Sequence, residues 1–126
     1  MIDTATRCAV VTGAATGIGR ATAVAFARDG YAVALVGRRT EPLEQLAAEI
    51  HDNGGQAIAT PADVTSQEQA TVAIGAAVER FGGIDVLVNN AAVGDSAALL
   101  DESLERWEET MRINLTGPFL ATRCRT

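Results

Sequence analysis

Four short apolar runs divide the chain at regular intervals. They occupy residues 7–12, 32–36, 57–60 and 85–89. Each run is apolar almost throughout instead of alternating between apolar and polar residues, which is typical of strands buried on both faces of a parallel sheet. The pattern therefore predicts four strands, each followed by a segment long enough to form a helix.

Between these runs, apolar residues recur at the three- and four-residue spacing of a helix face. The first two such stretches cover residues 18–30 and 40–53. A third follows Ser66, and Gln69 stands three residues later, which is the spacing of a capping box. A fourth begins near Ser103, and we expect its apolar face to hold Leu104, Trp107, Met111 and Leu115. The sequence thus predicts four helices that alternate with the strands.

This alternation predicts right-handed βαβ crossovers and hence an α/β fold with a parallel sheet. No linker, repeat or low-complexity tract divides residues 1–126. We therefore expect one domain.

Composition restricts the possible partners. The net charge of −6 argues against nucleic acid or an anionic membrane surface as a partner, and no apolar run reaches the length of a membrane span. One histidine and two distant cysteines do not provide a metal site of known spacing. Cys8 lies in a predicted strand and Cys124 close to the end of the chain, a usage that indicates reduced thiols and a cytoplasmic protein.

A glycine-rich segment, Thr12-Gly13-Ala14-Ala15-Thr16-Gly17-Ile18-Gly19, joins the first strand to the first helix. Bare glycine backbone and the positive end of a helix together favour a phosphate group. We expect Gly13 to form the tight turn, Gly17 to admit a pyrophosphate and Gly19 to allow close packing between helix and strand. By itself the spacing also fits an ordinary strand-to-helix loop.

The end of the second strand bears on the choice of cofactor. NAD sites usually carry an acidic residue there to bind the ribose 2′-hydroxyl. Here the sequence is Val36-Gly37-Arg38-Arg39, and no acidic residue lies between Gly30 and Thr40. Two guanidinium groups can bind a 2′-phosphate through charge-assisted hydrogen bonds. We therefore favour NADP(H) over NAD(H), although both arginines could instead be solvated surface residues.

Polar residues also follow the third and fourth strands. Asp63 could accept a hydrogen bond from an adenine amino group, and it could equally be a turn-forming aspartate ahead of a helix. The segment 89–92, Asn-Asn-Ala-Ala, lies at the sheet edge where open α/β proteins bind ligands. Its alternative is an asparagine-rich loop that stabilises itself.

These motifs together resemble the N-terminal half of a short-chain dehydrogenase/reductase. The resemblance rests on the glycine segment, Asp63-Val64, Asn89-Asn90-Ala91-Ala92, and Asn114 in Ile-Asn-Leu-Thr-Gly-Pro-Phe. It implies a Rossmann-type doubly wound parallel sheet, here truncated after about four strands. Thr12 and Asn89 would brace the turn and the sheet, and Asn114 would hold a water in the family's proton relay. The expected cofactor-binding residues are Thr12, Gly13, Thr16, Gly17, Ile18, Gly19, Arg38, Arg39, Asp63, Val64, Asn90, Ala91 and Ala92.

The family's remaining catalytic residues are not found in this sequence. They are a serine and a Tyr-x-x-x-Lys pair, and we expect them beyond Thr126, because the chain has no lysine and its only tyrosine is Tyr31. The resemblance thus implies the cofactor-binding part of an NADP(H)-dependent oxidoreductase for an alcohol or carbonyl substrate, inactive as this chain. The alternative is a non-catalytic dinucleotide-binding or interaction module. We also expect self-association or a homo-oligomer through the open edge of the fourth strand.

Overall fold

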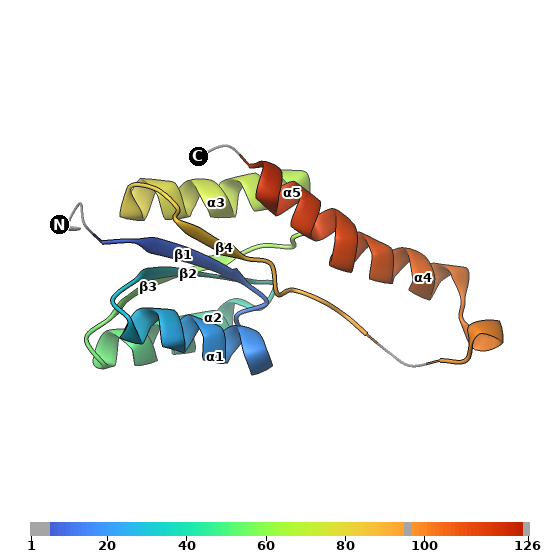
Figure 1. Cartoon of the computed structure of the whole chain (residues 1–126), viewed down its shortest axis with the longest axis horizontal. Helices are drawn as coiled ribbons and strands as arrows, with labels where there is room; N and C mark the ends of the chain where they lie inside the picture. The colour runs from blue at the N-terminus through green and yellow to red at the C-terminus, as the bar shows by residue number, and fades with distance from the viewer. Residues whose placement is uncertain (1–5, 95–96, 125–126) are drawn as a thin grey trace.

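The computed structural model describes residues 6–94 and 97–124. Its sheet has four parallel strands in the order β3-β2-β1-β4 (Figure 1). The strands are β1 (Cys8–Thr12), β2 (Ala32–Gly37), β3 (Gln56–Pro61) and β4 (Val86–Val88). The expected parallel α/β architecture is confirmed, and the strand order matches the first four strands of a Rossmann sheet.

β4 is shorter than the run that predicted it, and the residues at both of its ends make side-chain hydrogen bonds. At one end the Asp85 carboxylate accepts a hydrogen bond from the Cys8 backbone N–H at 2.7 Å. At the other end the Asn89 side chain donates to the Thr122 hydroxyl at 3.0 Å. The apolar part of the run alone forms the strand.

Helices cover both faces of the sheet, as expected for a doubly wound fold (Figure 1). One face carries α1 (Gly17–Arg28) and α2 (Thr40–Asp52), and the other carries α3 (Gln67–Phe81) and α5 (Gly117–Arg123). Between β4 and α5 lie a 3₁₀ turn (Leu99–Asp101), α4 (Leu104–Met111) and a π-helical segment (Arg112–Thr116). In Figure 1, α4 extends away from the sheet.

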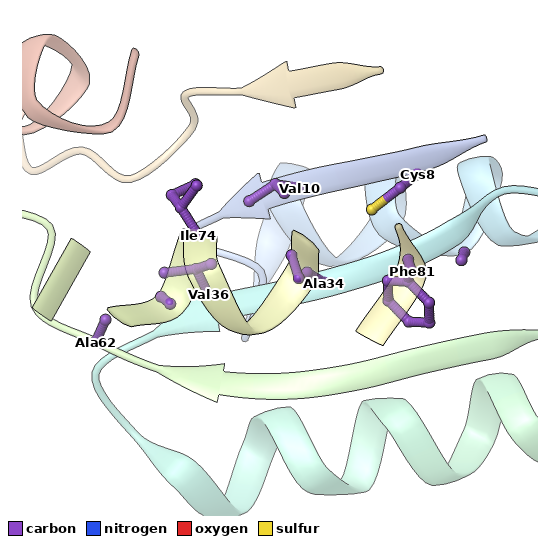
Figure 2. Close-up of a cluster of buried hydrophobic side chains, with 10 residues drawn as sticks. Cys8, Val10, Ala34, Val36, Ala62, Ile74 and Phe81 are labelled. Atoms are coloured by element: carbon purple, nitrogen blue, oxygen red, sulfur yellow. The ribbon is translucent and has the colours of Figure 1, made fainter. Parts of the chain in front are cut away.

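The core has two layers because successive strand residues point to opposite faces. On the α3 side, Cys8 and Val10 of β1 pack with residues of β2 and with Ile74 and Phe81 of α3 (Figure 2). On the other side, Val11 of β1 belongs to a cluster with Val33, Leu35, Leu43, Leu46 and Ile50. This accounts for strands without polar alternation, since both faces of the central strands are buried.

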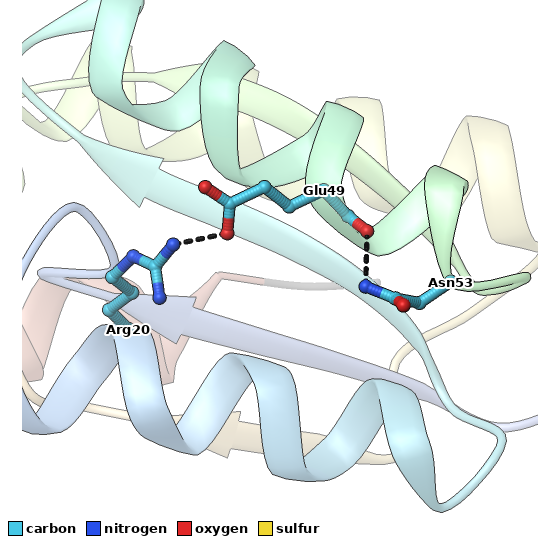
Figure 3. Close-up of polar contacts among 3 residues, drawn as sticks. All are labelled: Arg20, Glu49 and Asn53. Atoms are coloured by element: carbon cyan, nitrogen blue, oxygen red, sulfur yellow. Dashed lines mark hydrogen bonds and ion pairs between the residues drawn. The ribbon is translucent and has the colours of Figure 1, made fainter.

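One ion pair links α1 to α2 at the surface, next to a hydrogen bond at the C-terminal end of α2 (Figure 3). The Arg20 guanidinium pairs with the Glu49 carboxylate, and the Asn53 side chain donates to the Glu49 carbonyl at 2.9 Å. The side chains of Arg20 and Glu49 are 41% and 57% exposed, so the pair contributes at most about 1 kcal/mol to stability.

The predicted capping box at the start of α3 forms only in part. The Ser66 hydroxyl accepts from the Gln69 N–H at 3.2 Å, as expected. The Gln69 side chain, however, accepts from the Asp63 N–H at 2.8 Å and not from the N–H of Ser66. The Ser66 N–H instead donates to the Asp63 carbonyl at 3.0 Å. The helix start therefore fixes the loop that precedes it.

The apolar face expected on the last helix is present, but the described residues leave it uncovered. Of the four expected residues, Leu104, Trp107 and Leu115 are 69%, 57% and 61% exposed and Met111 is 39% exposed. Phe119 of α5, which the prediction did not include, is 58% exposed. The opposite side of α5 and the π-helical segment is the buried one, with Ile113, Gly117, Leu120 and Ala121. None of the helices within residues 6–94 and 97–124 combines the length and the hydrophobicity that a membrane span requires.

Candidate functional site

The glycine turn between β1 and α1 adopts backbone angles that only glycine takes readily. Gly13 has a φ of +64° and Gly17 a φ of +58°. α1 begins at Gly17, and its N-cap residue Thr16 makes no side-chain capping bond. A Cβ placed on Gly17 would meet no described atom within 4 Å. The turn therefore presents the uncapped N-terminus of a helix to open space, an arrangement that favours an anion.

Gly19, the third glycine of the segment, is required because there is no room for a side chain at this position. A Cβ on Gly19 would lie 2.1 Å from the Gly13 carbonyl oxygen and 2.4 Å from Nδ2 of Asn90. In the structure this Nδ2 donates to the Gly13 carbonyl at 3.2 Å. The first turn of α1 thus packs directly on the glycine turn, with Asn90 holding the turn from the end of β4.

Thr12 braces the same region from beneath. Its side chain is buried, and its Oγ1 accepts hydrogen bonds from the N–H groups of Asn90 at 2.9 Å and Ala91 at 3.0 Å. The hydroxyl also donates to the Val88 carbonyl at 3.4 Å. We expected Thr12 and Asn89 to brace the turn and the sheet. Thr12 and Asn90 hold the turn, and Asn89 links the end of β4 to α5.

A cleft of about 390 Å³ opens along the carboxyl ends of the strands, above the glycine turn. This size falls within the range of small-molecule sites. Ten of the expected cofactor-binding residues line the cleft: Gly13, Thr16, Gly17, Ile18, Arg38, Asp63, Val64, Asn90, Ala91 and Ala92. The structure thus brings together residues from all four strand-to-helix connections.

Three expected residues are not part of the lining. Thr12 and Gly19 support the turn through the contacts above, and Arg39 is exposed at the N-terminus of α2. Four lining residues were missed by the sequence analysis: Gly37, Ala62, Val93 and Ile113. The first two directly precede Arg38 and Asp63 at strand ends, so the strand boundaries could have indicated them. No pattern in the sequence singled out Val93 or Ile113.

Asp63 faces the cleft with one carboxylate oxygen already in use. Oδ1 accepts from the Thr65 hydroxyl at 2.7 Å and from the Thr65 N–H at 2.9 Å. These two bonds are the main reason that the pKa of Asp63 is lowered from its ordinary value. The positive charges of Arg38 and Arg112 lower it further. Within the part of the chain that the structure describes, Oδ2 accepts no hydrogen bond, so it is available as an acceptor.

Asn114 lies in the π-helical segment and contacts the loop after β4. Its Oδ1 accepts from the Val93 N–H at 2.9 Å, and its Nδ2 donates to the Val93 carbonyl at 2.7 Å. This paired contact fixes one wall of the cleft. The position expected for the proton relay therefore has its side-chain amide committed to Val93, and the relay role stays a prediction.

No group of three or more histidine, cysteine or carboxylate side chains among the described residues could hold a metal ion. The polar groups that line the cleft suit an anionic ligand. Backbone N–H groups and Arg38 can bind negative charge, and Asp63 and Asn90 can bind polar ring substituents.

The sequence of the chain is similar to those of known reductases and dehydrogenases. The chain is 41% identical over 116 residues to a 3-oxoacyl-[acyl-carrier-protein] reductase of Synechocystis, a match that covers 91% of this chain and 47% of the relative. It is 36% identical over 120 residues to the human hydroxysteroid dehydrogenase-like protein 2, covering 90% of this chain and 29% of that protein. The chain thus spans about half the length, or less, of the curated relatives it matches.

Solved structures of a ketoreductase and an alcohol dehydrogenase are also similar to this chain. A variant of actinorhodin polyketide ketoreductase with NADPH superposes with a TM-score of 0.91 at 34% identity, over 98% of this chain and 47% of that one. An alcohol dehydrogenase from Thermococcus sibiricus, complexed with 5-hydroxy-NADP, gives 0.90 at 38% identity, over 94% and 51%. The family model of the short chain dehydrogenases matches residues 7–125. The chain therefore belongs to the short-chain dehydrogenase family, whose members are oxidoreductases with an NAD(P)-binding fold.

Proposed function

We propose that residues 1–126 form a single dinucleotide-binding domain that binds NADP(H) in preference to NAD(H). The observation that carries the preference is Arg38, which lines the cleft directly after β2 where an NAD site places an acidic side chain. Arg39 follows it, and no acidic residue stands between Gly30 and Thr40. A 2′-phosphate would receive charge-assisted hydrogen bonds there, whereas a 2′-hydroxyl would find no carboxylate.

The rest of the cleft supports the same ligand. The pyrophosphate would bind the glycine turn and the N-terminus of α1, because the space above Gly17 is open. Adenine would lie near Asp63 and Val64, and the nicotinamide end near Asn90 and Ala91. When bound, the cofactor supplies hydride transfer to or from an alcohol or carbonyl substrate of the complete enzyme. The residues of this chain bind and orient it.

Cofactor titrations test the preference. We expect the wild-type chain to bind NADP⁺ at least about 10-fold more tightly than NAD⁺, since hydrogen bonds between charged groups contribute about 1.5–3 kcal/mol. Arg38→Ala should remove most of this difference and leave NAD⁺ affinity unchanged. Arg39→Ala should act less, because Arg39 does not line the cleft. Arg28→Ala, at the far end of α1, is the matched control. Tighter binding of NAD⁺ by the wild-type chain would refute the proposal.

We also propose that the 126-residue chain does not catalyse the reaction by itself. It contains no lysine, and its only tyrosine, Tyr31, precedes β2 at the opposite end of the strands from the cleft. There its ring packs edge-on against Phe26 with the centroids 4.9 Å apart. The general acid of the family has no counterpart among these residues. Oxidation of NADPH by the purified chain in the presence of a carbonyl substrate would contradict this.

The second candidate is a non-catalytic dinucleotide-binding or interaction module. The same lack of a lysine and a well-placed tyrosine favours it. This candidate requires tight, saturable NADP(H) binding by a chain that is stable alone, whereas a cofactor-binding portion of a larger enzyme requires only weak binding. Affinity and thermal stability measured on the same sample separate the two.

We propose that the chain self-associates through β4 and the apolar stripe formed by Leu104, Trp107, Leu115 and Phe119. β4 lies at the edge of the sheet, and the stripe is more than half exposed. Light scattering should report a species larger than a monomer. Trp107→Gln should reduce its size, whereas Val72→Gln, at an exposed position on α3, should not. A monodisperse wild-type monomer would refute this.

The two free thiols support the expected cytoplasmic location.

A further inference from the structure

We infer that Gly117 is a positioning residue for the adenine side of the cleft, because its missing side chain determines where Val64 lies. Gly117 is buried at the start of α5. A Cβ added there would lie 2.9 Å from Cγ2 of Val64 and 3.5 Å from its Cβ. Real Cβ atoms do not approach other atoms closer than 3.0 Å, so one of the two residues would have to move.

The backbone at Gly117 does not itself call for glycine. Its φ and ψ are both −56°, which are ordinary helical values that alanine adopts readily. A glycine inside a helix lowers stability relative to alanine, because it loses more conformational freedom on folding. At this position space, and not backbone geometry, disfavours a side chain. Gly75 in α3 provides the contrast, since a Cβ there would meet no described atom within 4 Å.

Val64 transmits the contact to the cleft, whose wall it forms next to Asp63. The start of this loop is held by α3, through the bond from the Asp63 N–H to Gln69. Valine has few favourable side-chain rotamers, so it cannot turn away freely from a new methyl group. A side chain at residue 117 would therefore displace Val64, and with it the wall.

The π-helical segment just before Gly117 holds the other wall. Ile113 lines the cleft directly, and Asn114 binds both backbone groups of Val93. Residues 113–117 thus contact both walls of the cleft. Asn114 restrains the Val93 side by hydrogen bonds, and Gly117 locates the Val64 side by close packing. A change at residue 117 should consequently affect one end of the ligand and spare the other.

This inference rests on the proposed function, and the test separates the two. The probes are adenosine 2′,5′-bisphosphate, which represents the adenine end of NADP, and nicotinamide mononucleotide, which represents the other end. The variants of the 126-residue chain are Gly117→Ala, Val64→Ala, the double variant, and Gly75→Ala as control. Binding is measured by ligand-observed NMR, and folding by circular dichroism.

We expect Gly117→Ala to weaken binding of the adenosine probe about 5-fold or more. A coupling of this size is typical of two residues in direct contact, here residue 117 and Val64. Binding of the mononucleotide should change less than about 2-fold, a selectivity that general destabilisation would not produce. Gly75→Ala should leave both affinities unchanged. In the Val64→Ala background, Gly117→Ala should cause no further loss, because the methyl group it meets has been removed.

The outcomes are distinguishable. Wild-type protein that binds neither probe overturns the proposed function, and this inference with it. Wild-type protein that binds the adenosine probe, with Gly117→Ala binding it equally well, overturns only the inference. If Gly117→Ala alone does not fold, the double variant decides, since the inference requires it to match Val64→Ala in folding and in adenosine-probe affinity. Weaker binding by the double variant than by Val64→Ala overturns the inference.

Discussion

The buried hydroxyl of Thr12 offers a sharp test of how the site is built. Thr12→Val replaces the hydroxyl with a methyl group of similar size, so packing is nearly unchanged. The substitution removes the acceptor of two backbone N–H groups, those of Asn90 and Ala91, and the donor to the Val88 carbonyl. The loss is therefore almost entirely one of hydrogen bonding.

The expected size of the effect follows from these contacts. A buried donor left without a partner costs about 1–3 kcal/mol. Asn90 and Ala91 are only partly buried, so water can reach their N–H groups in part and the lower half of that range applies. Two such donors give a loss of about 2–4 kcal/mol in the free energy of unfolding. This is a large share of the roughly 5–15 kcal/mol typical of a folded domain.

Thr60→Val is the matched control. Thr60 is also a buried threonine near the end of a strand, but among residues 6–94 and 97–124 its hydroxyl donates to the Leu35 carbonyl at 3.1 Å and accepts no N–H group. Its loss leaves no N–H group unpaired and should cost about 1 kcal/mol. Urea unfolding followed by circular dichroism suits the comparison, because exposed Trp107 is a poor fluorescence reporter.

The result that would refute this reasoning is equal destabilisation by Thr12→Val and Thr60→Val. Thr12→Ser keeps the test decisive if Thr12→Val does not fold. Serine retains the acceptor, so the variant should fold and lose only the contribution of one methyl group, about 1 kcal/mol. A Thr12→Ser variant as unstable as Thr12→Val would show that the hydroxyl is not what matters.

Two further predictions concern titrating groups. The pKa of Asp63 is lowered in the folded state, mainly by bonds from Thr65, so its charge stabilises the fold at neutral pH and this stability is lost as the pH falls through the lowered pKa. The stability difference between wild type and Asp63→Asn, from urea unfolding at several pH values, should therefore shrink on acidification; a constant difference would contradict this. Burial raises the pKa of Cys8 to about 11, so at pH 8 a thiol reagent should modify Cys124 quickly and Cys8 only on unfolding. Equal rates for the two thiols in the folded chain would show that Cys8 is accessible.

The hydrophobic pattern was sufficient to predict the strands and their parallel arrangement. Continuous apolar runs occur where both sheet faces are covered, as for β1 and β2 here. The pattern was less informative at the ends of β4, where Asp85 and Asn89 make side-chain bonds that spacing does not encode. It also indicated an apolar face on α4, which includes Trp107, but not what covers that face.

Within the site, the sequence indicated residue types better than partners. The glycine turn was recognisable because Gly13 and Gly17 adopt backbone angles that other residues avoid. That Asn90 and not Asn89 holds this turn depends on which of two adjacent side chains points toward it. Ile113 lines the cleft only because the chain returns to the sheet after α4, which local spacing does not determine.

The brace on the glycine turn has a consequence for the order of folding. Thr12 receives its two hydrogen bonds from residues 78 and 79 positions further along the chain. By contrast, β1 pairs with β2 across only 24 positions, from Cys8 to Ala32. Contacts between distant residues form late, since a long loop must close first. During synthesis the turn therefore emerges early but stays incomplete. The glycine turn that follows Thr12 acquires its final shape only when residues 90 and 91 join the sheet.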